Sequence, residues 1–83
     1  MKTFLFIKER KKGSHTITFS IYKVVKNEPT YLDQLKVDGR GYRGDIPSIC
    51  RKLRELKVIT KGELENYSGF SPSFNLYQIA SWL

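Results

Sequence analysis

Residues 4–25 of the chain read FLFIKERKKGSHTITFSIYKVV. Two runs of strand-forming residues lie on either side of the turn RKKGS at residues 10–14, a pattern that predicts a β-hairpin. In the second run, Ile17, Phe19 and Ile21 alternate with polar residues, as in a strand with one buried face. We therefore predict a hairpin that carries a positive tip.

The length of the turn determines which faces of the two strands match. The first run is apolar on both sides, with Phe4 and Phe6 on one face and Leu5 on the other. A turn of two or four residues pairs Phe6 with Phe19, and the same register pairs Phe4 with Ile21. A turn of three or five residues moves Phe4 and Phe6 to the other face, where they could stack on bases. We expect the even turn, because it joins aromatic and β-branched partners across the strands.

A third strand is predicted after residues 27–29, Asn-Glu-Pro, which we interpret as a three-residue connection. Proline has no amide hydrogen for a strand ladder, so it should end a strand rather than lie inside one. The cross-strand pairs in this register are Val25–Tyr31, Lys23–Asp33, Ile21–Leu35 and Phe19–Val37. The resulting antiparallel meander has one apolar face, which must be covered.

The cover is predicted to be a helix that follows the glycine-rich loop at residues 39–44. Asp45 can cap this helix, and Pro47 is tolerated in its first turn. Apolar residues then recur at helical spacing, at Ile46, Ile49, Cys50, Leu53 and Leu56. The tripeptide Arg-Gly-Asp at residues 43–45 is explained by this cap and needs no adhesive role.

The C-terminal part of the chain can be interpreted in two ways. Thr60 and Glu63 have capping-box spacing for a short helix through about Tyr67. The apolar run at residues 74–83 could then form a strand, with Tyr77 and Ile79 on one side, or a helix capped by a preceding serine. We expect the strand, which would complete the sheet.

The helical alternative resembles the helix–turn–helix pattern of DNA-binding regulators. The residues that carry the resemblance are Glu63-Leu64, Gly69-Phe70-Ser71-Pro72-Ser73 and Leu76, and the pattern as a whole covers about 20 of the 83 residues. Three residues depart from the pattern: Glu65 stands where a small residue is usual, and Asn75 and Gln78 stand where apolar residues usually pack. The resemblance would imply that Pro72, Ser73, Asn75 and Tyr77 approach base edges.

The predicted fold is thus a single small α+β domain at residues 1–83. It consists of a three-stranded antiparallel meander covered by one amphipathic helix, followed by a short helix and a C-terminal fourth strand. With 40% hydrophobic and 13% aromatic residues, the chain has the composition of a folded protein rather than a disordered one.

Several classes of site are disfavoured by the composition. Cys50 is the only cysteine and His15 the only histidine, which excludes a disulfide framework and a His/Cys metal cluster. The glycines at residues 39–44 lack the spacing of a phosphate-binding P-loop, and the carboxylates form no paired motif. The apolar run near the N-terminus is too short for a signal peptide or a membrane span. We therefore expect a soluble cytoplasmic protein that is not an enzyme, with no metal, no cofactor and no membrane association.

The charge points to a polyanionic partner. The formal net charge is +7, and residues 1–43 contain ten of the 15 Lys and Arg residues but four of the eight Asp and Glu residues. Clustered cations gain free energy when they release counterions condensed on nucleic acid. We predict binding of DNA or RNA through the hairpin tip and the adjacent loop, with Lys8, Arg10, Lys11, Lys12, Arg40 and Arg43 on phosphates.

A second function class remains open. Residues on the reverse face of the meander are also apolar, namely Leu5, Ile7, Tyr22, Val24 and Leu32. Such a face could bind a protein partner or a second copy of the chain. The chain would then be a non-enzymatic interaction module, that is, an accessory, inhibitor or assembly subunit of the kind that phages and mobile elements also encode.

Overall fold

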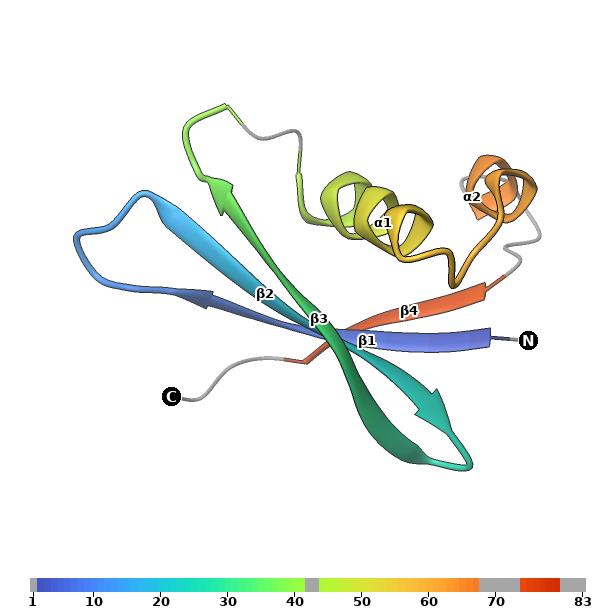
Figure 1. Ribbon diagram of the computed structural model, residues 1–83. Helices are drawn as coiled ribbons and strands as arrows, with labels where there is room; N and C mark the ends of the chain where they lie inside the picture. The colour runs from blue at the N-terminus through green and yellow to red at the C-terminus, as the bar shows by residue number, and fades with distance from the viewer. Residues whose placement is uncertain (1, 42–43, 68–73, 80–83) are drawn as a thin grey trace.

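The computed structural model describes residues 2–41, 44–67 and 74–79 (Figure 1). Its elements in chain order are β1 (Lys2–Arg10), β2 (Thr16–Val25), β3 (Glu28–Asp38), α1 (Asp45–Glu55), α2 (Lys61–Tyr67) and β4 (Phe74–Ile79). The strands form one sheet in the order β3-β2-β1-β4, in which β4 is parallel to β1 and the other neighbours are antiparallel. Both helices lie on the same side of the sheet. The predicted α+β fold is confirmed.

The first hairpin has the predicted faces but a shifted register. Six residues lie between the paired residues Arg10 and Ile17, an even number, so Phe4 and Phe6 face the core and are buried. Phe6 lies opposite Ile21 rather than the predicted Phe19. The Phe6 and Phe19 rings still meet diagonally, edge to face, with their centroids 5.8 Å apart. The predicted direct pairs were therefore wrong by two residues, while the predicted core was right.

The connection between β2 and β3 differs from the prediction. It is a two-residue turn in which Lys26 and Asn27 have φ of 51° and 65°, as in the tight turns that match the twist of a hairpin. Pro29 lies inside β3, opposite Val24, and β3 is an edge strand, where a proline is tolerated. The predicted three-residue connection was wrong.

The pairs predicted for β3 are displaced as a result. Phe19 lies opposite Leu35, and a bulge between Ile21 and Tyr22 changes the register further along. The predicted pair of Lys23 with Asp33 does not form. Asp33 instead lies 3.2 Å from Lys52 Nζ on α1, which ties the helix to the edge of the sheet. Hydrogen bonds from the Gln34 backbone and from Lys52 lower the pKa of Asp33.

Helix α1 begins differently from the prediction. Gly44, with φ of 113°, is the residue before the first turn, and no side chain makes a capping hydrogen bond there. Asp45 is the first helical residue, and its Oδ2 atom lies 3.2 Å from Lys8 Nζ on β1. The predicted Asp45 cap was therefore wrong: Gly44 occupies the cap position, and the Asp45 carboxylate contacts Lys8. Pro47 lies in the first turn, as expected.

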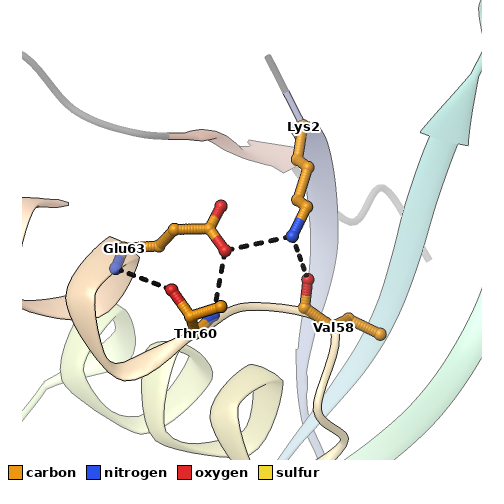
Figure 2. A network of polar contacts seen from close by, with 4 residues as sticks. All are labelled: Lys2, Val58, Thr60 and Glu63. Atoms are coloured by element: carbon orange, nitrogen blue, oxygen red, sulfur yellow. Dashed lines mark hydrogen bonds and ion pairs between the residues drawn. The ribbon is translucent and has the colours of Figure 1, made fainter.

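Helix α2 has the predicted capping box, which also fastens the start of β1 (Figure 2). Thr60 Oγ1 accepts a hydrogen bond from the Glu63 amide at 3.1 Å, and Glu63 Oε1 accepts one from the Thr60 amide at 2.9 Å. Lys2 Nζ lies 3.0 Å from Glu63 Oε1 and donates to the carbonyl oxygen of Val58 at 3.0 Å. The hydrogen bond from the Thr60 backbone, followed by that from Lys2, lowers the pKa of Glu63.

The apolar run after residue 73 is a strand, as expected, and not a recognition helix. Phe74 is buried against Phe4, with their ring centroids 5.9 Å apart. Tyr77 and Ile79 point to the opposite face, in the alternation that favoured a strand. The helix–turn–helix alternative was therefore wrong at residues 74–79, and its turn at residues 68–73 lies outside the described residues.

The core lies between the sheet and the helices. Its buried residues are Phe4, Phe6, Ile17, Phe19, Ile21, Ile49, Cys50, Leu53, Ile59 and Phe74. No helix or strand among the described residues covers the other face of the sheet. Two surfaces are therefore candidates for a functional site: the positively charged tip of the β1–β2 hairpin, and the face of the sheet that the helices do not cover.

Candidate nucleic-acid interface and open sheet face

The hairpin tip, residues 10–15, lies at one end of the sheet (Figure 1), and its sequence contains three cations. Arg10, Lys11 and Lys12 are exposed and line a shallow hollow together with the other residues of the turn. The Ser14 amide donates to the carbonyl oxygen of Lys11 at 3.0 Å, and Gly13 has φ of 81°, a conformation that favours glycine. Within the described part of the chain, none of the three cations forms an ion pair.

The loop after β3 begins beside the hairpin tip. The Gly39 amide donates to the carbonyl oxygen of His15 at 2.6 Å. A Cβ atom at Gly39 would lie 3.0 Å from the same oxygen, a tight contact that a larger residue could make only if the backbone shifted by a few tenths of an ångström. The next residue, Arg40, is held by Asp38, with Nη2 and Oδ2 3.2 Å apart. Hydrogen bonds from the Arg40 side chain and then its backbone lower the pKa of Asp38.

The six predicted phosphate-binding residues therefore differ in position and in whether a carboxylate contacts them. Arg10, Lys11 and Lys12 lie together at the hairpin tip. Lys8 and Arg40 each contact a carboxylate, so their charges are partly neutralised. Arg43 lies outside the described residues. The hairpin tip is the strongest concentration of unpaired positive charge that the predicted set provides.

The open face is the side of the sheet that points away from the helices. The described residues that form its apolar part are Leu5, Ile7, Tyr22, Val24, Tyr31, Tyr77 and Ile79. Four of these belong to the predicted partner-binding set. Leu32, the fifth predicted member, is the extra residue of the β3 bulge and packs against the core.

Three residues join the open face that were not in the predicted partner-binding set. Tyr31 packs edge to face on Tyr22, with ring centroids 5.6 Å apart, and is 55% exposed. Tyr77 and Ile79 come from β4 and are 57% and 44% exposed. The alternation in residues 74–79 placed the latter two on one side, but only the parallel pairing with β1 brings them beside Leu5 and Ile7.

Charged side chains are scarce on the open face. In the strands that the structure describes, Glu9, Lys36 and Asp38 are the charged residues on this side, and Thr18 lies between Glu9 and Lys36. A surface that follows a nucleic-acid backbone needs several cations beside its aromatic residues. Among the described strand residues, Lys36 is the one cation on this face, so the open face lacks the several cations that such a surface needs.

Other sites for chemistry are sparse in the described residues. Burial raises the pKa of the Cys50 thiol to about 11, so it stays protonated near neutral pH and is a poor nucleophile. In residues 2–41, 44–67 and 74–79, no three His, Cys, Asp or Glu side chains are grouped to hold a metal ion. The same residues contain no helix with the length and hydropathy needed to span a bilayer.

No protein-family model, no curated protein and no solved structure matches the chain. The hairpin tip and the open face are thus the two features from which a function can be inferred.

Proposed function

We propose that the protein binds nucleic acid by phosphate contacts at the hairpin tip. The observation that carries this proposal is the group formed by Arg10, Lys11 and Lys12, which are adjacent, exposed and without ion pairs among the described residues. Exposed cations without ion pairs can neutralise phosphates at little cost in free energy, because no existing ion pair has to be broken. Each contact then releases a condensed counterion.

The turn is suited to this role because its backbone is fixed. The Ser14 amide donates to the Lys11 carbonyl oxygen across the turn, and the Thr16 amide donates to Ser14 Oγ at 3.1 Å. The tip also projects beyond the end of the helices (Figure 1), so a bulky duplex can approach it. Cations that meet phosphates carry no sequence information, so the binding we propose is independent of sequence.

The test compares two triple variants with the same change of charge. Arg10, Lys11 and Lys12 are changed together to Glu in one variant; the control changes Arg51, Arg54 and Lys61, which are exposed on the helices. Fluorescence anisotropy is measured with duplex DNA, single-stranded DNA and RNA. Three phosphate contacts predict that duplex affinity falls about 500-fold between about 20 and 200 mM salt.

The first variant should lose binding at low salt, while the control should keep most of it. Absence of binding to all three nucleic acids at about 20 mM salt would refute the proposal, because electrostatic attraction is strongest there. Equal losses in the two variants would show that net charge, rather than the hairpin tip, is responsible.

A second function is favoured by the open face. Its seven apolar residues and few charges are typical of a surface that binds protein. In this case the chain acts as an interaction module, such as an accessory, inhibitor or assembly subunit. Replacing Leu5 by Asp should then abolish complex formation while the chain stays folded by circular dichroism, since Leu5 points away from the core.

A further inference from the structure

The two edges of the sheet are built differently. β3, at one edge, contains Pro29, a bulge and four charged residues, all of which discourage pairing with another strand. β4, at the other edge, reads FNLYQI and contains neither proline nor charge. Short uncharged segments with high β-propensity are those most ready to pair with a further strand. Only one edge of the sheet is therefore protected.

The outer side of β4 is available for such pairing. In the described residues, β4 pairs with β1 alone. Tyr77, Gln78 and Ile79 are exposed, although Tyr and Ile are residues that usually pack in sheets. An unprotected edge thus coincides with exposed apolar side chains on the same strand.

The distribution of charge on the chain bears on which partner can pair with β4. The chain carries a formal net charge of +7, so two copies repel each other wherever their charged surfaces meet. β4 is free of charge, so two copies can approach along it without placing like charges side by side. Nucleic acid is a poor occupant, because β4 offers no cation for its phosphates.

We propose that β4 pairs antiparallel with β4 of a second copy, so that two sheets join across a twofold axis. This inference rests on the second proposed function and makes its partner another copy of the chain. In an antiparallel pair, opposing residues point to the same face, so identical strands must centre on one residue. Centring on Tyr77 uses residues 75–79 and places Tyr77 opposite the partner's Tyr77.

The test uses sedimentation velocity on the full chain at about 10 to 200 µM, where dimers of ordinary affinity are populated. The wild type should show twice the 9.7 kDa mass of the chain. Tyr77→Lys should weaken the dimer at least about tenfold, because two cations then lie directly opposite each other. Tyr31→Lys is the matched control, since Tyr31 is equally exposed on the open face but belongs to the protected edge.

Mixing variants tests the register itself. An equimolar mixture of Tyr77→Lys and Tyr77→Glu should recover the dimer, because opposite charges then meet across the axis. Tyr77→Cys should form a disulfide-linked dimer under mild oxidation, while the buried Cys50 does not react. This variant covers the case in which a charged residue prevents folding.

A monomeric wild type over the whole concentration range would overturn the proposal, as would equal weakening by Tyr31→Lys and Tyr77→Lys. If the mixture of Tyr77→Lys and Tyr77→Glu does not dimerise and Tyr77→Cys forms no disulfide, the register centred on Tyr77 is wrong. Salt separates this inference from nucleic-acid binding, because screening should strengthen the dimer and weaken the nucleic-acid complex. Glu substitutions at the hairpin tip should leave the dimer intact, so either proposal can fail without the other.

Discussion

Two isoleucines on opposite faces of the sheet give a direct test of which face is the core. Ile21 on β2 is fully buried beneath the helices, whereas Ile7 on β1 is half-buried on the open face. The substitution Ile→Ala removes the same atoms at both positions. It therefore compares the two environments without a difference in chemistry.

The expected magnitudes follow from burial. At Ile21, the lost transfer free energy is about 2 kcal/mol, and the residual cavity raises the total to about 3 kcal/mol. At Ile7, water or a rearranged neighbour can fill the space, so we expect about 1 kcal/mol. An 83-residue domain has a free energy of unfolding of about 4–12 kcal/mol, so the first change removes a large fraction of it.

Urea unfolding followed by circular dichroism measures both changes. With an m-value of about 1.5 kcal/mol/M, the midpoint should fall by about 2 M for Ile21→Ala and by less than about 1 M for Ile7→Ala. A larger loss at Ile7 than at Ile21 would refute the assignment of faces, because it would mean that the open face is covered and the helix side is not.

Three further predictions concern single residues. Gly39→Ala should lower the melting temperature and weaken nucleic-acid binding measured by anisotropy, because its Cβ would meet the carbonyl oxygen of His15 at 3.0 Å. Gly62→Ala should raise the free energy of unfolding, measured with urea, by about 0.5–1 kcal/mol, since Gly62 is helical and the new Cβ would make only an ordinary 3.9 Å contact. A loss of stability would contradict the α2 geometry. The pKa of Glu63 is lowered below 4.5 in the folded state, so its contribution is present above that value and is lost as the pH falls through the folded pKa. Urea midpoints between about pH 7 and 3 should therefore fall less steeply in Glu63→Gln than in the wild type, and equal slopes would refute a stabilising role for the contacts of Glu63 with Thr60 and Lys2.

The faces of the strands could be predicted from the sequence, but their registers could not. The alternation around Phe19 shows which side chains are buried, and a shift of two residues preserves that set. The shift reflects a longer turn than predicted, with six residues between Arg10 and Ile17, and the hydrophobic alternation does not determine the length of the turn. At the β2–β3 turn, Lys26 adopts a positive φ, although lysine is not a residue that predicts one.

In the candidate sites too, features formed by neighbouring residues could be predicted, whereas features formed by residues distant in sequence could not. The hairpin tip could be predicted because Arg10, Lys11 and Lys12 are neighbours in the chain. The ion pair of Lys8 with Asp45 joins residues 37 positions apart, and no local pattern signals it. Tyr77 joins the open face only because β4 pairs with β1, a contact between the two ends of the chain.

The position of β1 between β2 and β4 has a consequence for the order of folding. The pairs β1–β2 and β2–β3 join neighbours in sequence, whereas β1 and β4 are joined across some 70 residues, as in Phe4 and Leu76. Closing so long a loop is slow compared with forming a hairpin, so we expect the meander to form before β4 docks. Local opening should follow the same order, and the amide hydrogens of β4 should therefore exchange with solvent sooner than those of β2.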